Sequence, residues 1–290
     1  MRQNDPDAGI QRCGHGDLVE TQDGRWFMVY LCGRMIGDGF SILGRETALD
    51  PVTWTPDGWP IVNGLKGPST MQVKPFRSYD PGETRGVSPC GLPFDYMTPR
   101  PFAKGDVKYF PESGRFEIKG SKAPLSSVDS RNIVLKRQTA FEFKYEVTLE
   151  IPTMTEGQSA GITGYYDENT FLEFGINCRG GQIYLYSNEH VGDTDNTKIS
   201  DAPIPAGVSK IRLIMDTSYL TRKLFYQYLT EDGAETEFAV LENVYYLCDE
   251  GLSKGKRFTG AMAGMYAYAG ESDLTAVFYC FLTKEIHAKW

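Results

Sequence analysis

Several features that mark particular classes of protein are missing from this sequence. No apolar run reaches the ~18 residues that a membrane-spanning helix needs. The first seven residues, MRQNDPD, are polar and lack the apolar stretch of a secretory signal peptide. From these absences we expect a cytoplasmic product without a membrane partner.

Positive charge is also in short supply. Thirty Lys and Arg stand against 38 Asp and Glu, which gives a formal net charge of −8. An acidic surface argues against nucleic acid or an anionic membrane as partner, and it suits a neutral ligand such as a sugar. The six cysteines form no CxxC pair and show no metal-ligand spacing, so we expect small buried hydrophobic residues rather than disulfides.

A long amphipathic helix is the last missing element. The 31 Gly, 16 Pro and 13% aromatic residues instead separate and fill many short runs of strand-forming sequence. The clearest is FEFKYEVTLEI at 141–151, in which apolar and polar residues alternate as in a half-buried antiparallel strand. This pattern predicts an all-β protein.

The strand candidates fall into two groups. In residues 1–66, short runs flank the turns QDG at 22–24 and PDG at 56–58, which predicts about one β-propeller blade with pieces of another. Residues 67–75 resemble a linker. Residues 76–290 carry at least nine further strand candidates, from 115–119 to 276–282, and predict a β-sandwich.

Three short sequence motifs in residues 1–66 occur in an informative order. They are CGHGDLVE at 13–20, LGRET at 43–47 and DGWPIVN at 57–63. In that order they resemble the end of the five-bladed β-propeller of family 43 glycoside hydrolases, the β-xylosidase and α-arabinofuranosidase group.

Four shorter phrases extend the resemblance into the second group: SSVDS at 126–130, KRQ at 136–138, GQSAG at 157–161 and FTGA at 258–261. They resemble the concanavalin A-like, jelly-roll sandwich that follows the propeller in the larger β-xylosidases. The resemblance therefore covers nearly the whole chain from about residue 10, and it implies a partial propeller followed by that sandwich.

The resemblance also implies three residues that contact substrate. His15 matches the histidine at the propeller centre, near a bound metal or water. Arg45 matches an arginine that points into the active-site funnel, and its five guanidinium donors suit sugar hydroxyls or a carboxylate. Phe258 matches an aromatic on a sandwich loop that closes the pocket, although a buried core phenylalanine is an equally good interpretation.

The catalytic carboxylates of the family have no counterpart here. Inverting glycosidases need an acid and a base ~6.5–9.5 Å apart. In the family these lie upstream of the CGHGD phrase, and none of the Asp or Glu residues here occupies their motifs. We therefore expect no catalytic residue on this chain, which we expect to be inactive by itself, and we expect Glu46 to be structural.

A structural calcium is the remaining expectation from the family. Asp80 matches one acidic ligand, but AVFY at 276–279 replaces a strand that commonly carries two Asp, which leaves that calcium in doubt. No cofactor is otherwise required.

The sequence thus predicts the C-terminal portion of a glycosidase of hemicellulose breakdown, with xylo- or arabino-oligosaccharides as ligands. A truncated product and one half of a split enzyme both fit. The protein partner would be the missing N-terminal propeller half or a second copy of the chain. The alternative is a non-catalytic carbohydrate-binding or assembly module.

Overall fold

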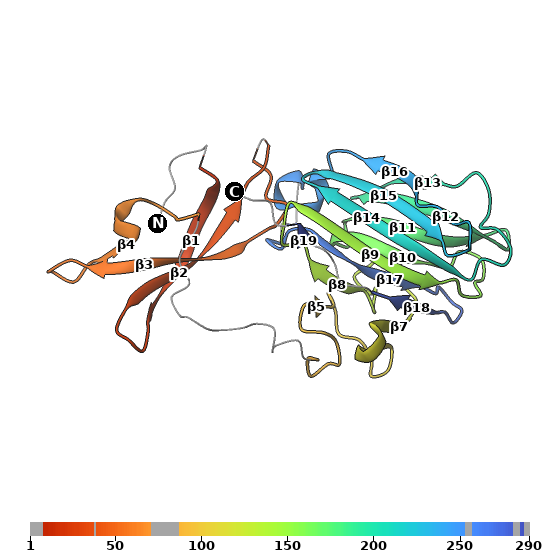
Figure 1. Cartoon of the computed structure of the whole chain (residues 1–290), viewed down its shortest axis with the longest axis horizontal. Coiled ribbons are helices and arrows are strands. Elements are labelled where there is room, and N and C mark those ends of the chain that lie inside the picture. Colours follow the sequence, from red (N-terminus) through yellow and green to blue (C-terminus); the bar gives the residue numbers. More distant parts are fainter. Residues whose placement is uncertain (1–7, 38, 71–86, 253–256, 281–284, 287–290) are drawn as a thin grey trace. The chain divides into compact units, whose positions relative to one another are not determined.

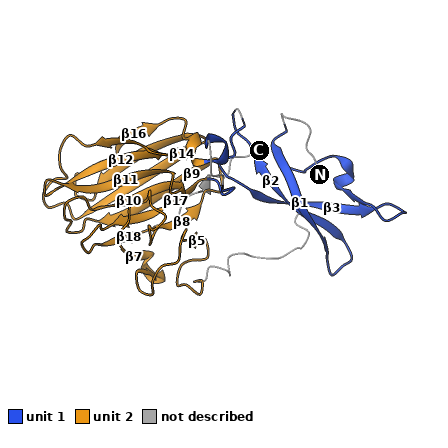
Figure 2. Cartoon of the chain, turned by 180° about the vertical axis from the view of Figure 1, so that it is seen from behind, with its two compact units in different colours: residues 1–81, 248–260 blue, residues 82–247, 261–290 orange. Residues whose placement is uncertain are grey.

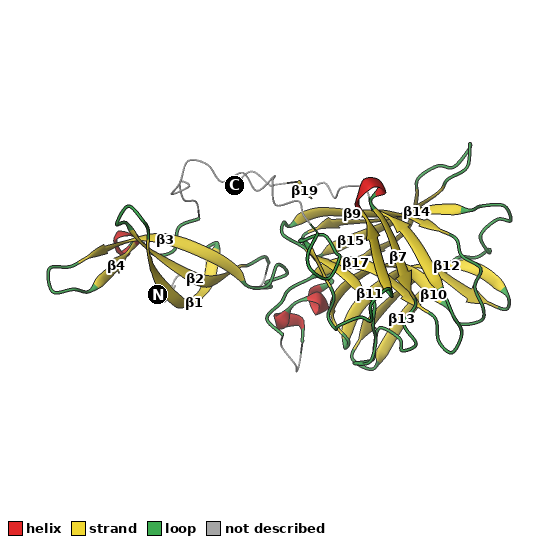
Figure 3. Ribbon diagram, turned by 90° about the horizontal axis from the view of Figure 1, so that it is seen from below, coloured by secondary structure: helices red, strands yellow, loops and turns green. Residues whose placement is uncertain are grey.

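The computed structural model describes residues 8–37, 39–70, 87–252 and 257–280, with the backbone of 285–286, and it is almost wholly β (Figures 1 and 3). Its described helices are single 3-10 turns, and none has the length or apolar character to cross a membrane. The chain forms two compact units, coloured separately in Figure 2: residues 1–81 with 248–260, and residues 82–247 with 261–290.

Unit 1 contains one antiparallel four-stranded meander in the order β1-β2-β3-β4. Its strands are β1 (Ile10–Glu20), β2 (Trp26–Arg34), β3 (Glu46–Trp54) and β4 (Pro60–Val62), followed by the 3-10 turn η1 (Asn63–Leu65). Both predicted turns are present: the Thr21 N–H donates to the Arg25 carbonyl at 2.8 Å, and the Thr55 N–H to Trp59 at 2.9 Å. A four-stranded meander of this kind is the fold of a propeller blade.

Unit 2 is a sandwich of two antiparallel sheets, as the strand pattern predicted. The first sheet has the order β13-β12-β11-β10-β17-β8-β5. Its strands are β13 (Thr194–Ile199), β12 (Gln182–Val191), β11 (Thr170–Arg179), β10 (Ser159–Asp167), β17 (Met262–Tyr268), β8 (Val134–Arg137) and β5 (Tyr96–Met97).

The second sheet has the order β16-β15-β14-β9-β18-β7-β6, and β19 also pairs with β9. Its strands are β16 (Thr236–Leu241), β15 (Thr221–Tyr228), β14 (Lys210–Ser218), β9 (Glu142–Glu150), β18 (Thr275–Tyr279), β7 (Arg115–Lys119), β6 (Val107–Phe110) and β19 (Glu285–Ile286). Three further 3-10 turns lie among the described residues: η3 (Pro111–Ser113), η4 (Tyr245–Leu247) and η5 (Asp249–Gly251).

The core lies between the two sheets. In β9, Phe143, Tyr145, Val147 and Leu149 are buried while the residues between them are half-buried, which confirms the alternation predicted for 141–151. Burial of one face of each sheet against the other is the main source of stability in such a sandwich. The first sheet is anchored to the second by side chains such as Phe174, whose ring centroid lies 5.4 Å from that of Phe238 on β16.

Two expectations need correction. The sequence placed all of 76–290 in the sandwich, whereas residues 248–260 form part of unit 1, because their side chains and backbone contact β1 and the segment before β3. The cysteines do not all lie in the core. Cys32, Cys178 and Cys248 are buried, but Cys90 is exposed and the other two are half-buried.

Candidate functional site

Two irregularities interrupt strand β1 where the predicted site begins. The register with β2 shifts between Gln11 and Gly14 and again between Gly14 and Asp17. At each shift one residue adopts a left-handed backbone: Arg12 with φ +58° and His15 with φ +51°. Such bulges redirect side chains out of the regular alternation, and left-handed non-glycine residues often occur at functional sites.

A close backbone contact joins the segment before β3 to residues 248–260. Gly44 has φ +70°, and a Cβ built on it would lie 2.3 Å from the Thr259 carbonyl oxygen. A Cβ on Gly260 would lie 2.3 Å from the Gly44 nitrogen. Only glycine at both positions allows the two segments to approach this closely.

The same segment is held at its other end by Glu250. Its carboxylate accepts hydrogen bonds from the Arg12 guanidinium, from the Ser41 N–H at 2.8 Å and from the Ser41 hydroxyl. The Glu250 side chain is only 14% exposed, so these partners replace most of its lost hydration. Asp249 in turn accepts the Phe258 N–H at 3.1 Å.

These contacts bring Phe258 onto Arg45. The Arg45 guanidinium carbon lies 5.2 Å from the centroid of the Phe258 ring, within the range of a cation–π interaction. Phe258 itself has φ +62° and stays 53% exposed, so it is not a core residue of the sandwich. The structure therefore brings together two of the three residues predicted to contact substrate.

A second guanidinium adds positive charge to this region. Burial, and then the neighbouring charge of Arg45, lower the pKa of Arg12. Glu250 pairs with Arg12, and the Arg45 guanidinium lies against the exposed Phe258 ring.

His15 is exposed on β1, within the second register shift. Among the residues that the structure describes, no three His, Cys, Asp or Glu side chains gather as a metal-binding group. Asp80, the predicted calcium ligand, lies outside the described residues.

The buried carboxylates of unit 1 are held by structural partners. Asp50, which is fully buried, accepts hydrogen bonds from the Tyr30 hydroxyl and from the Ser69 N–H at 3.2 Å. Burial and this hydrogen bond to Asp50 raise the pKa of Tyr30 well above its usual range. Glu46 forms an ion pair with Arg34 at 2.7 Å, in keeping with its predicted structural role.

Arg12, Ser41 and Glu250 were not predicted from the sequence. They carry no local signature, because 238 residues separate the two members of the Arg12–Glu250 pair. The glycines that join the segments were visible within the quoted LGRET and FTGA phrases, but nothing in either phrase indicates the other as its partner.

Comparison with known proteins agrees with this architecture. Residues 90–283 match the family described as the β-xylosidase C-terminal concanavalin A-like domain, and residues 1–60 match glycosyl hydrolases family 43. Xylosidase/arabinosidase 43B of Humicola insolens is 28% identical over 276 residues, which cover 90% of this chain and 50% of that protein. The β-xylosidase of Bacillus subtilis is 28% identical over 283 residues, which cover 90% of this chain and 52% of that protein.

Solved structures give the same result. The family 43 protein BlXynB of Bacillus licheniformis superposes with a TM-score of 0.84 at 30% identity, covering 98% of this chain and 55% of that one. The chain thus spans about half the length of the relatives that it matches. Because the C-terminal domain of these enzymes matches well over half of its 290 residues and a family 43 segment precedes it, the chain belongs to glycoside hydrolase family 43.

Proposed function

We propose that this chain supplies one wall of the sugar-binding site of a glycosidase that hydrolyses xylosides or arabinosides, with the catalytic acid and base supplied from outside this sequence. The observation that carries the proposal is the Arg45–Phe258 contact, held by the glycine pair and by the Glu250 anchor. The names of the relatives, which include xylosidases and arabinosidases, support the choice of sugar.

Arg45 and Phe258 suit a sugar in complementary ways. A pyranose or furanose ring has apolar C–H faces and a rim of hydroxyls, so it takes an aromatic contact and directed hydrogen bonds together. Phe258 offers an exposed ring, and Arg45 offers rigid N–H donors beside it. His15 would contribute a further polar group from β1.

Hydrolysis needs two carboxylates at a suitable separation and a water molecule, and no cofactor. In unit 1, Glu46, Asp50 and Glu250 are engaged by structural partners. We therefore expect the acid and base to come from the preceding propeller blades, whether these belong to a partner or to the same polypeptide. Those blades would also cover the exposed edges of the single blade sheet.

Activity measurements test this proposal. The chain alone should not release nitrophenol from aryl xylosides or arabinosides above the buffer rate. Mixed with a polypeptide that carries the preceding blades of a family 43 β-xylosidase, it should restore hydrolysis. In that mixture Arg45→Ala should lower kcat/KM by about 10–1,000-fold, the usual range for loss of a directed contact at the reacting sugar.

Arg25→Ala is the matched control, because Arg25 is an exposed arginine at the β1–β2 turn, paired with Asp23. It should leave both assembly and turnover unchanged. Hydrolysis by the mixture at the wild-type rate with Arg45→Ala would show that Arg45 does not contact substrate. Hydrolysis by the chain alone, lost on replacing one of its own carboxylates, would show that the acid or base lies here.

The second candidate is a non-hydrolytic sugar-binding or assembly module. It is favoured by the structural engagement of the unit 1 carboxylates described above. Sugar binding or partner binding without any restored turnover would support it.

A further inference from the structure

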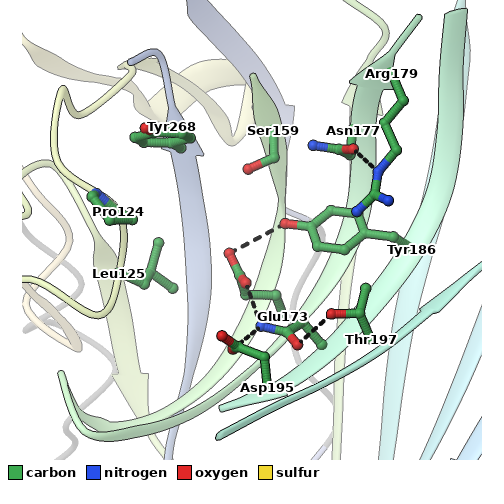
Figure 4. Close-up of a pocket in the computed structure, with 11 residues that line it drawn as sticks. Pro124, Leu125, Ser159, Glu173, Asn177, Arg179, Tyr186, Asp195, Thr197 and Tyr268 are labelled. Carbon is green, nitrogen blue, oxygen red and sulfur yellow. Dashed lines mark hydrogen bonds between the residues drawn. The ribbon is translucent and has the colours of Figure 1, made fainter. Parts of the chain in front are cut away.

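Unit 2 contains a cavity of about 240 Å³ whose lining belongs entirely to this unit. It lies on the face of the first sheet that points away from the second sheet. Phe174 of β11 points toward the second sheet, so Glu173 and Asn177, at odd positions of the same strand, point to the outer face. Both residues line the cavity (Figure 4).

Beside the cavity, two glycines lie between two tyrosines in a row across the sheet. Tyr186, Gly175, Gly161 and Tyr266 are cross-strand partners on four successive strands. A Cβ on either glycine would lie within 2.3 Å of a backbone oxygen. The two tyrosine rings extend across the space above these glycines, and their hydroxyls form a hydrogen bond.

Glu173 lies at the centre of the polar side. Its carboxyl accepts hydrogen bonds from the Tyr186 hydroxyl at 3.2 Å and from the Asn188 amide at 3.3 Å. Asn188 also donates to Asp195 at 2.8 Å and accepts from the Thr197 hydroxyl at 2.8 Å. These bonds fix the polar groups in place while leaving lone pairs on both carboxyl groups for a ligand.

The two carboxyl groups of the cavity differ in charge state. Burial raises the pKa of Glu173 to about 7, so near neutral pH this group both donates and accepts hydrogen bonds. The hydrogen bond from Asn188 lowers the pKa of Asp195, which therefore remains an anionic acceptor. Arg179 supplies a cationic donor; its Nε–H donates to the side-chain Oδ1 of Asn177 at 2.7 Å, which orients the guanidinium.

The opposite side of the cavity is mainly apolar. Pro124, Leu125 and Tyr268 lie together across from the polar group (Figure 4). A cavity with one aromatic and aliphatic side and one side of fixed donors and acceptors suits a ligand whose ring has an apolar face and a hydroxyl rim. The two carboxyl groups disfavour an anionic ligand. A purely apolar ligand is disfavoured as well, because it would displace water from the polar side chains without replacing its hydrogen bonds.

We propose that this cavity binds one uncharged sugar ring, with its C–H face on Tyr268 and its hydroxyls on Glu173 and Arg179. The volume lies below the ~300–1,000 Å³ of drug-sized ligand sites, which favours a single ring over a longer chain. The choice of a pentose, as a terminal xylosyl or arabinosyl unit, rests on the proposed function. The sandwich would then hold substrate chains through a site of its own.

Calorimetry on the whole chain with xylose, arabinose and xylobiose tests this proposal without any turnover. We expect a Kd on the order of 1 mM, which a ligand of about ten non-hydrogen atoms reaches at an ordinary ligand efficiency. Tyr268→Ala and Arg179→Ala should each weaken binding at least tenfold. Glu237→Gln, which changes an exposed carboxylate on β16, should leave the Kd unchanged.

Arg45→Ala separates this site from the one in unit 1. It should leave the calorimetric Kd unchanged even where it abolishes turnover of the reconstituted enzyme. Loss of binding in Arg45→Ala with full binding in Tyr268→Ala and Arg179→Ala would overturn the proposal. Absence of heat at 50-fold the expected Kd would also overturn it. Pentose binding that depends on Tyr268, with no restored hydrolysis in any mixture, would uphold this inference and refute the proposed function.

Discussion

Replacing Glu173 by glutamine should remove most of the pH dependence of unit 2 stability between about pH 4.5 and 7. Burial raises the pKa of this carboxyl from its ordinary value of 4.5 to about 7, and the charge of Asp195 adds to the effect. Between these two values the folded protein keeps a proton that the unfolded chain has already released. The free energy of unfolding is therefore full below about pH 4.5, falls as the pH rises to about 7, and is level above it.

The magnitude follows from the gap between the two pKa values. At ~1.4 kcal/mol for each pKa unit, the gap corresponds to about 3 kcal/mol. This is an upper bound, because Glu173 is only partly buried and solvent screens part of the interaction. Glutamine keeps the shape of the protonated acid, accepts from Asn188 and can donate to the Tyr186 hydroxyl.

We expect the Glu173→Gln variant and the wild type to differ little at pH 5, and the variant to be more stable by about 1–3 kcal/mol at pH 8. Urea unfolding followed by far-UV circular dichroism at pH 5, 6, 7 and 8 measures this difference, and hydrogen exchange of the β11 amides assigns it to unit 2. Glu237→Gln on β16 controls for the loss of a surface charge. Parallel stability profiles of wild type and Glu173→Gln would refute the assignment of a protonated carboxyl at Glu173.

Three further predictions concern unit 1 and the relative stability of the units. Gly44→Ala should displace residues 257–260 and lower the free energy of unfolding by several kcal/mol, because the new Cβ would lie 2.3 Å from the Thr259 oxygen. Gly58 also has a positive φ but lies in open space, so Gly58→Ala should lower the free energy of unfolding by only about 1 kcal/mol. Urea titration of both variants measures the difference. Arg12→Ala should cost about 1–3 kcal/mol and speed hydrogen exchange at 248–252, because it removes the charged partner of Glu250; equal exchange in variant and wild type would contradict the anchoring role. Strand β9 is paired on both sides and buries alternate side chains in the core. Its backbone amides should therefore exchange far more slowly than those of β1 in the isolated chain. Equal protection factors measured by NMR would argue against the sandwich as the main folding unit.

The sequence by itself determined the fold class and many of its strands. Strict alternation at 141–151 specifies a strand with one buried face, and β9 has that burial pattern. The Asp-Gly turns specified the hairpins of unit 1, because they fix local backbone geometry. Strands β13 and β16 escaped prediction because they are edge strands with largely exposed residues, so no hydrophobic pattern marks them.

Tertiary structure alone decided which distant residues meet. Arg45 and Phe258 were predicted separately, but only the folded chain places them 5.2 Å apart, through a contact between Gly44 and Gly260 that neither local sequence encodes. The Glu250 anchor and the cavity around Glu173 depend in the same way on side chains from separate strands. Local patterns reflect the environment of one segment at a time, whereas a binding site depends on the register and packing of several segments, which only the complete fold establishes.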